Sequence, residues 1–390
     1  MYNKLGKRNC SGCHACFNIC PVNCISMDYD SEGFLYPIIN QSLCIKCGRC
    51  EKACPVLNKS QSAEDKINAY AGINLDENTR MQSSSGGIFS LIAEYVLDNN
   101  GVVFGASFDE NQEVCHIEIS EKSELSKLRG AKYLQSRIGD AYAKTEKILK
   151  EDRLVLFSGT PCQIAGIKAY LGKEYQNLIL LDIICHGVPS PKIWTEYLKQ
   201  QENKNKTSFT KIGLIKFREK VPGWRNYSIV LDFGNGRKYK KLALEDSFMR
   251  AFLKNYILRP SCYNCHFKID KSMADITLGD FWGIEKVLPD VSDNKGISLI
   301  FAHTEKGRNV LQLINEKMLC YEVKAADAVK YNPSAVQSTL LPPEREKFID
   351  TVFKYGFKEA EKVFLKRTFK ERCFNKVKRK IKEVLNYVQK

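Results

Sequence analysis

The order of apolar and polar positions predicts alternating strands and helices in the middle of the chain. Two short apolar runs, 154–157 and 178–184, have the length and unbroken hydrophobicity of strands buried inside a parallel sheet. Each run ends in a small polar loop, and a helical pattern follows, to about residue 171 and over 192–201. This repeat predicts βαβ units, whose ligands commonly bind beyond the carboxyl ends of the strands.

The flanking regions carry further periodic segments. The pattern predicts helices over 88–97 and 138–150, and strands over 102–108 and 114–119. The remaining predicted elements are antiparallel strands within 211–240 that turn at Asn235 and Gly236, a helix over 244–255, a strand around 276, and a strand and helix within 297–318. Polar residues 58–66 are predicted to form a linker.

Eight cysteines near the N-terminus repeat one pattern twice. In each copy two residues separate the first three cysteines, and a fourth cysteine follows after three more residues, with a proline behind it. This spacing is typical of bacterial ferredoxins that hold two 4Fe-4S clusters, in which the fourth cysteine of each run serves the other cluster. The predicted ligands are Cys10, Cys13, Cys16 and Cys54 for one cluster, and Cys44, Cys47, Cys50 and Cys20 for the second. Zinc sites or a disulfide framework are the alternatives, although zinc sites usually use two cysteine pairs with a longer gap.

Composition adds bounds on size and compartment. A chain of 390 residues with 44% hydrophobic and 27% charged residues is of ordinary globular type and long enough for two or three domains. No apolar run approaches the 18 or so residues of a membrane span, and residues 1–12 lack an apolar leader. Sixteen cysteines without a leader favour thiolates bound to metal in a reducing compartment, so we expect a cytoplasmic protein.

The formal net charge of +15 is concentrated at the C-terminus. Residues 354–390 contain 13 Lys and Arg against 4 Asp and Glu, so nucleic-acid binding by the rest of the chain is not expected. Apolar positions there recur mostly every three or four residues, which predicts an amphipathic helix. Its basic face suits an anionic membrane surface or a partner protein, and the alternative is a helix packed on its own domain.

Four further cysteines have positions that suit a metal site. Cys162 and Cys185 each follow one of the two buried strands, and Cys262 and Cys265 form a CxxC pair. Together they are enough to hold a third 4Fe-4S cluster, although small core residues and a redox dithiol are alternatives. The other cysteines, Cys24, Cys115, Cys320 and Cys373, are predicted to be structural. His186 and His266 each follow a cysteine and are predicted to serve packing or hydrogen bonding rather than ligation.

The turn Ser83-Ser-Ser-Gly-Gly87 opens a predicted helix. Free N–H groups and the helix dipole favour a phosphate at such a position, and the glycines permit close approach of a pyrophosphate. An ordinary serine N-cap is the alternative. No GxGxxG fingerprint or P-loop is present in the sequence, so a standard Rossmann NAD site is not expected.

Several motifs, in the same order, resemble the coenzyme F-420 hydrogenase/dehydrogenase beta-subunit family. They are Ser83–Gly87, Leu128–Ser136, Phe157–Gly166, Cys185–Pro191, Arg259–Cys265 and Ala274–Gly283. The resemblance extends from about residue 69 to residue 333, and a fused ferredoxin module is common in that family. The basic tail lies outside it.

This resemblance implies an FAD-binding α/β domain with an iron–sulfur cluster close to the flavin. It implies that the third cluster is held by Cys162, Cys185, Cys262 and Cys265. The implied FAD contacts are Ser83, Ser84, Ser85, Gly86, Gly87, Lys132, Tyr133, Gln135, Ser136 and Thr160. Members of the family pass a hydride between reduced flavin and a substrate, while clusters exchange single electrons with the flavin.

The sequence therefore predicts a combined α+β and α/β chain of three parts. These are a dicluster ferredoxin domain over 1–60, a flavin-binding mixed α/β domain over 68–345, and a basic amphipathic helical tail over 346–390. The hypothesis is an iron–sulfur flavoprotein oxidoreductase that acts with a donor or acceptor protein and a small substrate, either a deazaflavin coenzyme or a sugar intermediate. The alternative is an electron-transfer subunit that feeds a partner enzyme and has no substrate site. The sequence identifies no catalytic residue.

Overall fold

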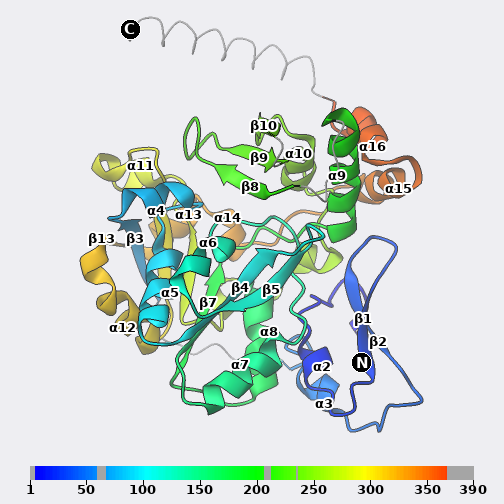
Figure 1. Cartoon of the computed structure of the whole chain (residues 1–390), viewed down its shortest axis with the longest axis horizontal. Coiled ribbons are helices and arrows are strands. Elements are labelled where there is room, and N and C mark those ends of the chain that lie inside the picture. The colour runs from blue at the N-terminus through cyan, green and yellow to red at the C-terminus, as the bar shows by residue number, and fades with distance from the viewer. Residues whose placement is uncertain (1–4, 59–66, 206–211, 234–235, 367–390) are drawn as a thin grey trace, which may run out of the picture.

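The computed structural model describes residues 5–58, 67–205, 212–233 and 236–366 (Figure 1). Within these ranges the chain builds a small N-terminal part, a large mixed sheet covered by helices, and a three-stranded sheet packed against further helices. Most of the predicted linker, Asn235 of the predicted turn, and residues 367–390 of the predicted tail lie outside the described residues.

The N-terminal part is built around an antiparallel hairpin and two short helices. Strands β1 (Ile25–Tyr29) and β2 (Leu35–Ile39) pair with Ile25 opposite Ile39. Helices α2 (Ala15–Asn18) and α3 (Arg49–Lys52) each begin just inside one of the two cysteine runs. The two cysteine runs therefore flank the hairpin, and each contributes one short helix.

Eight strands form one mixed sheet in the order β13-β3-β12-β11-β7-β6-β4-β5. The central strands β4, β6, β7 and β11 are parallel to one another, and the strands on both flanks pair antiparallel. The predicted βαβ unit is confirmed, because β6 and β7 are parallel neighbours joined by helix α8. The strands are β3 (Asn68–Asn74), β4 (Val102–Phe108), β5 (Val114–Ile119), β6 (Val155–Gly159), β7 (Leu178–Ile183), β11 (Ile276–Asp280), β12 (Ser298–Ala302) and β13 (Met318–Val323).

Helices cover both faces of this sheet, which explains the unbroken apolar runs of its central strands. Alternate residues of a strand point to opposite faces. Leu156 therefore packs with helices α5 and α12, whereas Val155 and Phe157 pack with α7 and α8. The helices around the sheet are α4 (Glu77–Gln82), α5 (Ile88–Asp98), α6 (Leu125–Leu128), α7 (Ala141–Lys150), α8 (Pro161–Leu171), α11 (Ile284–Val287), α12 (Glu305–Leu313), α13 (Ala325–Lys330) and α14 (Pro333–Val336).

A second core lies under the three-stranded sheet, which has the order β10-β9-β8. Its strands are β8 (Leu214–Glu219), β9 (Ser228–Asp232) and β10 (Lys238–Leu242), and its helices are α9 (Pro191–Asn205), α10 (Ser247–Leu253), α15 (Arg345–Tyr355) and α16 (Phe357–Phe364). The first 20 or so residues of the predicted tail belong to this core, because Phe348, Val352, Phe357 and Leu365 are buried in it. No helix in the described ranges has both the length and the apolar character needed to cross a membrane.

Candidate functional site

The N-terminal cysteines gather into two groups. Burial raises the pKa of the Cys16 thiol well above its ordinary value, and the thiols around it raise that pKa further. Those neighbours include Cys10, Cys13 and Cys54, so the fourth cysteine of the second run lies with the first three of the first run. No disulfide joins any of the 15 cysteines in the described ranges.

The second group contains a cysteine that the spacing did not single out. Cys20 and Cys24 are buried together, with Cys44 and Cys50 packed against them. The two sulfurs of Cys20 and Cys24 are 3.4 Å apart, and the Cys24 N–H donates to the Cys20 sulfur at 3.3 Å. Hydrogen bonds to ligand sulfurs tune cluster potentials, so Cys24 belongs to the environment of this group. Cys47, the remaining predicted ligand, is exposed.

The four cysteines of the large domain line a single cavity. Cys162 lies in the first turn of α8, Cys185 follows β7, and Cys262 and Cys265 lie within and just after a 3-10 helix over Pro260–Asn264. Because β6 and β7 are parallel neighbours, the loops after them emerge at one edge of the sheet. Burial raises the pKa of Cys162 to about 11 and that of Cys262 to about 12, and nearby thiols add to both rises. Four cysteine thiols that line one cavity are the type of donor that a 4Fe-4S cluster uses, and binding of such a cluster would release their protons.

Local sequence explains why these loops converge. Helix α8 begins with a capping box, in which the Gln163 side chain accepts from the backbone N–H and the hydroxyl of Thr160 at 2.9 and 3.1 Å. The Thr160 hydroxyl also lies 3.2 Å from the Cys162 sulfur. Gly187 has a φ of +144°, and a Cβ there would meet the side chains of Leu258 at 2.9 Å and Cys262 at 3.3 Å. Glycine at this position therefore lets the loop after Cys185 approach the CxxC segment.

The two histidines beside cysteines line the same cavity. Nε2 of His186 contacts Oδ1 of Asn255 at 2.7 Å, and its ring packs edge-on against Phe252. Burial lowers the pKa of His186. This histidine therefore has the hydrogen-bonding and packing surroundings that the sequence predicted.

The predicted flavin turn is joined to the second predicted flavin segment. The Ser84 hydroxyl accepts from the N–H of Ala131 at 2.6 Å. Gly86 is packed so closely that a Cβ would lie 2.2 Å from the carbonyl oxygen of Gly72. Helix α5 begins after Gly87, which has a left-handed backbone and no side-chain cap, so the serine N-cap alternative is wrong.

The residues of the segment 132–136 contact different parts of the protein. Lys132 turns back onto carbonyl groups at the end of α6, and burial lowers its pKa to about 7. Tyr133 stacks on Phe252 with ring centroids 4.9 Å apart. Gln135 points toward the N-terminal part, where it donates to the carbonyl oxygen of Ser11 at 3.2 Å. Ser136 is linked to Thr160 through Gln163, which donates to its carbonyl oxygen at 3.1 Å.

Two basic residues of β8 and its following turn reach this region, although no sequence signal pointed to them. Lys220 donates to the carbonyl oxygens of Arg80 at 2.7 Å and Ser85 at 2.5 Å, and burial lowers its pKa to about 7. Arg218 forms an ion pair with Asp280. Nε and Nη2 of Arg218 are buried and have no hydrogen-bond partner among the described residues. Unsatisfied buried donors are costly, so they suit an acceptor on a bound ligand.

The aromatic surroundings of Arg218 also suit a planar ligand. Its guanidinium lies 4.3 Å from the ring centroid of Tyr227 and 5.4 Å from that of Trp282. Trp282 in turn stacks on Trp224 at 4.8 Å, and the indole N–H of Trp224 donates to Asp280 at 2.7 Å. Only the fold unites these residues, because Trp224 and Asp280 lie more than 50 positions apart in the sequence.

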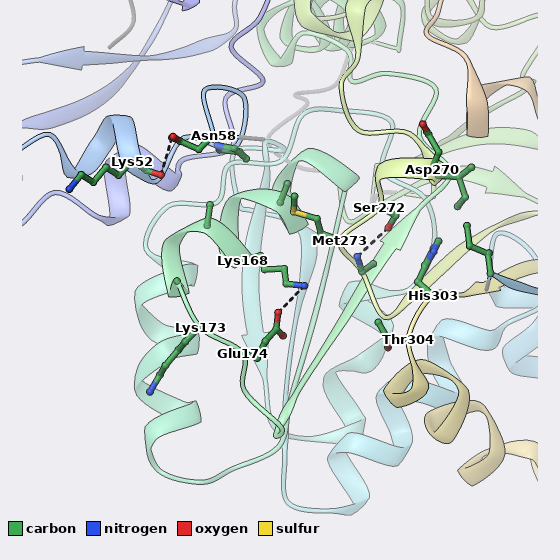
Figure 2. Close-up of a pocket in the computed structure, with 17 residues that line it drawn as sticks. Lys52, Asn58, Lys168, Lys173, Glu174, Asp270, Ser272, Met273, His303 and Thr304 are labelled. Atoms are coloured by element: carbon green, nitrogen blue, oxygen red, sulfur yellow. Dashed lines mark hydrogen bonds and ion pairs between the residues drawn. The ribbon is translucent and has the colours of Figure 1, made fainter. Parts of the chain in front are cut away.

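A separate cleft of about 510 Å³ opens between the N-terminal part and the large domain (Figure 2). Lys52 and Asn58 line it from one side, and Lys168, Met273 and His303 from the other. Nε2 of His303 lies 2.8 Å from the hydroxyl of Thr277, which also contacts the buried carboxyl group of Asp182. A hydrogen-bonded chain therefore leads from the cleft toward the end of β7.

Two segments of the chain match known protein families. Residues 152–328 match the family described as the C terminus of the coenzyme F420 hydrogenase/dehydrogenase beta subunit, and residues 9–58 match the 4Fe-4S dicluster domain. The coenzyme F420-dependent sulfite reductase of Methanocaldococcus jannaschii is 23% identical over 320 residues, which are 79% of this chain and 46% of that protein. One subunit of the F(420)H(2) dehydrogenase of Methanosarcina mazei is 24% identical over 212 residues, which are 49% of this chain and 58% of that protein.

The chain thus spans about half the length of the curated relatives it matches. Among solved structures, a chain of the F420-reducing [NiFe] hydrogenase complex from Methanosarcina barkeri is 15% identical, with a TM-score of 0.46. That alignment covers 73% of this chain and 98% of the solved chain.

Proposed function

We propose that the chain is an iron–sulfur flavoprotein oxidoreductase, because residues 9–58 match the 4Fe-4S dicluster domain and residues 152–328 match the coenzyme F420 hydrogenase/dehydrogenase beta-subunit family. Its electrons pass between three 4Fe-4S clusters and FAD, and a hydride passes between the flavin and an organic substrate. The observation that carries this proposal is the convergence of Cys162, Cys185, Cys262 and Cys265 on one cavity beside the dicluster domain.

The contact between the two domains supports a direct route for electrons. The thiol of Cys162 is close enough to Cys13 to add to the rise in the pKa of Cys13, so the first N-terminal group adjoins the third group. The hydroxyl of Tyr142 donates to the carbonyl oxygen of Cys13 at 2.8 Å, which fixes the cysteine loop to helix α7. We call the group of Cys10, Cys13, Cys16 and Cys54, which adjoins the large domain, the inner group. The group of Cys20, Cys44, Cys47 and Cys50 is the outer group.

The outer group is exposed, as a site that exchanges electrons with a partner protein must be. Leu43 and Ile45 beside it are 55% and 61% exposed, and Cys47 is exposed as well. Isolated apolar side chains are common on protein surfaces, but here they flank a predicted cluster ligand. An external electron donor or acceptor protein would bind at this end.

For the flavin, we propose the region where Ser83–Gly87, Lys132–Ser136 and Thr160 meet β8. The buried, unpaired Nε and Nη2 of Arg218 supply donors for a flavin or substrate acceptor, and Lys220 holds the Ser83–Gly87 turn through the carbonyl oxygen of Ser85. Bound flavin supplies the conversion between one-electron and two-electron chemistry. The protein side chains bind it, orient it and exclude water.

The substrate proposal has two forms. The relatives named for coenzyme F420 favour a deazaflavin coenzyme, and a sugar intermediate of a polysaccharide pathway is the second candidate. An electron-transfer subunit without a substrate site is the alternative function, favoured by the match to one subunit of a dehydrogenase. A cytoplasmic location, and contact of the basic tail with a membrane surface, remain proposals.

Photoreduction of the anaerobically purified protein tests this function. We expect bound flavin that bleaches on reduction and is reoxidised by a deazaflavin coenzyme or another small oxidant within seconds. Reoxidation only by a redox protein would instead favour the electron-transfer alternative. A folded protein without flavin or iron would overturn the proposal.

A further inference from the structure

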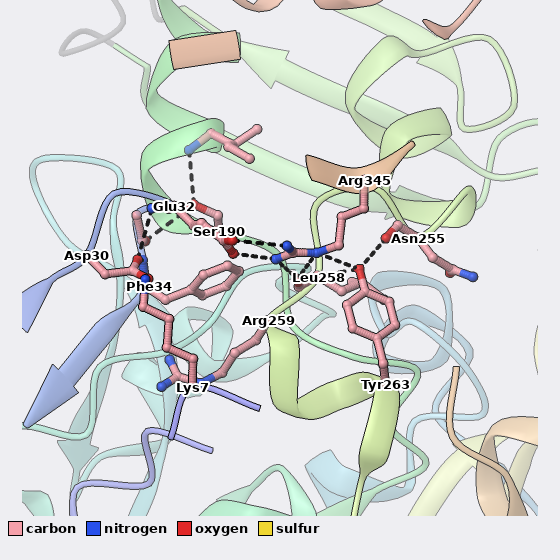
Figure 3. A network of polar contacts seen from close by, with 12 residues as sticks. Lys7, Asp30, Glu32, Phe34, Ser190, Asn255, Leu258, Arg259, Tyr263 and Arg345 are labelled. Carbon is pink, nitrogen blue, oxygen red and sulfur yellow. Dashed lines mark hydrogen bonds and ion pairs between the residues drawn. The ribbon is translucent and has the colours of Figure 1, made fainter. Parts of the chain in front are cut away.

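Arg259 connects the two domains at the point where their cysteine groups meet. It is fully buried, and its guanidinium reaches from the large domain into the dicluster domain (Figure 3). Nε donates to the carbonyl oxygen of Cys10 at 2.8 Å, and Nη2 to that of Leu35 at 3.0 Å. Nη2 also lies 3.9 Å from the sulfur of Cys10. The guanidinium further packs on the ring of Tyr36, 4.1 Å from its centroid.

The charge of Arg259 has no counterion among the described residues. Four arginines are buried there, and the other three each pair with a carboxylate. Those pairs are Arg80 with Asp293, Arg218 with Asp280, and Arg345 with Glu32. The acceptors around Arg259 are carbonyl and amide oxygens and the Cys10 sulfur. A buried cation normally requires a compensating anion, and the anion in this place would be a thiolate-ligated cluster.

Arg259 also faces the third cysteine group. It lines the cavity of Cys162, Cys185, Cys262 and Cys265. The backbone carbonyl of Arg259 accepts from the N–H of Cys262 at 2.9 Å, so the same residue orients the CxxC segment. One guanidinium therefore lies between the Cys10 group and the large-domain group.

The neighbouring sequence fixes this position. Gly12 has a φ of +65°, and a Cβ there would lie 2.8 Å from Nη1 of Arg259. Only glycine both adopts that backbone readily and leaves room for the guanidinium. Gln135 fixes the guanidinium of Arg259 through two hydrogen bonds. Its side-chain oxygen accepts from Nη1 of Arg259 at 2.9 Å, and its side-chain nitrogen donates to the carbonyl oxygen of Ser11 at 3.2 Å. Gln135, which the family resemblance assigned to the flavin, thus orients Arg259.

We propose that Arg259 is a positioning residue that favours the reduced state of the cluster bound through Cys10 and holds it beside the large-domain cysteines. This inference rests on the proposed function. Reduction adds one electron, and hence one negative charge, to a cluster without breaking a bond. A fixed cation beside a ligand sulfur stabilises that charge strongly in a buried site, so it raises the reduction potential. Electrons entering from the outer group are thereby drawn to the inner one.

Arg345 provides a matched control at the same domain interface. It is also buried, and it also ties the dicluster domain to the large domain, through Glu32 at 2.5 Å and the carbonyl oxygen of Leu258 at 2.8 Å (Figure 3). Its neighbours are Glu32 and Tyr263, and it makes no hydrogen bond to a sulfur within the described residues. Removing Arg345 weakens docking without removing charge from Cys10.

The test is a redox titration of the full-length anaerobic protein followed by electron paramagnetic resonance, with iron and sulfide counted per chain. In Arg259→Met we expect one cluster to become at least about tenfold harder to reduce, a fall of about 59 mV for a one-electron couple. Arg345→Met should keep all midpoint potentials. Full iron content with unchanged potentials in Arg259→Met would overturn the proposal.

A second variant covers the case in which Arg259→Met does not assemble. Loss of one cluster from Arg259→Met but not from Arg345→Met would support the positioning role. Gln135→Leu, which keeps the charge but frees the guanidinium, should then lower the same midpoint potential by less than about 59 mV, that is, make the cluster less than tenfold harder to reduce. Unchanged potentials in that variant would overturn the tuning role. Wild-type protein that binds no iron would refute the proposed function itself, before any variant is compared.

Discussion

At the residue scale, the buried carboxyl group of Asp182 is the clearest titrating group outside the cysteine sites. It lies at the end of β7, accepts from the hydroxyl of Ser272 at 2.9 Å, and also contacts the hydroxyl of Thr277. Burial raises its pKa to about 7, because these two hydrogen bonds only partly offset the loss of water. The folded protein therefore holds a proton on Asp182 at a pH where the unfolded chain has lost it.

This shift predicts a pH-dependent stability. Below about pH 4, the pKa of this carboxyl group in the unfolded chain, Asp182 is protonated in both states and does not destabilise the fold. As the pH rises toward 7, the unfolded chain loses this proton while the folded protein keeps it, so the free energy of unfolding falls. Asp182→Asn removes the titration, so the variant should gain roughly 2–4 kcal/mol in unfolding free energy relative to wild type between pH 4 and pH 7. Anaerobic denaturant unfolding at several pH values measures the difference. A difference that stays constant with pH would contradict the assignment.

Individual residues show which parts of the site could be predicted from the sequence and which could not. The 4Fe-4S dicluster domain could be predicted because the spacing of its eight cysteines is itself the signal. Arg218 and Arg259 could not, since nothing in a single sequence distinguishes a buried arginine from an exposed one. Gln135 was assigned to the flavin through its motif, yet its side chain contacts Ser11 and Arg259.

At the element scale, strands with a clear apolar pattern were predicted, and a strand with a weak apolar pattern was missed. Strands β4 and β5 have the predicted bounds, because each carries several β-branched or aromatic residues within a short segment. Strand β3 was missed, since Ala69, Ala71 and Gly72 give it little apolar signal. The small residues have a packing reason, because a Cβ at Gly72 would lie 2.6 Å from Ile300. Long-range packing that selects small residues is invisible to periodicity.

A second element-scale prediction concerns the contact between helix α8 and the first cysteine loop. A Cβ at Gly166 would lie 3.0 Å from the Cβ of Cys13 and 2.7 Å from the hydroxyl of Tyr142. Gly166→Leu should therefore push the first cysteine loop off the helix, with loss of iron and faster amide exchange over 10–16. Ala169→Leu is the matched control, because Ala169 lines the open cleft of about 510 Å³. Equal exchange and iron content in the two variants would show that this contact does not hold the loop.

At the scale of the whole molecule, the described cysteines form three neighbouring groups. The outer group lies beside exposed Leu43 and Ile45, the inner group adjoins α8, and the third group lies at the edge of the large sheet. The first two groups belong to the small domain and the third to the large one. The central claim is that the third group holds a cluster and so joins the two domains into one electron path.

Iron content per chain tests that claim most directly. Three 4Fe-4S clusters correspond to about twelve irons in the anaerobic wild-type protein, and loss of the third leaves about eight. We expect about eight in the double variant Cys262→Ser/Cys265→Ser, and about twelve in Cys115→Ser/Cys320→Ser, which alters cysteines outside the three groups. A Cys262→Ser/Cys265→Ser protein with as much iron as wild type would contradict the account.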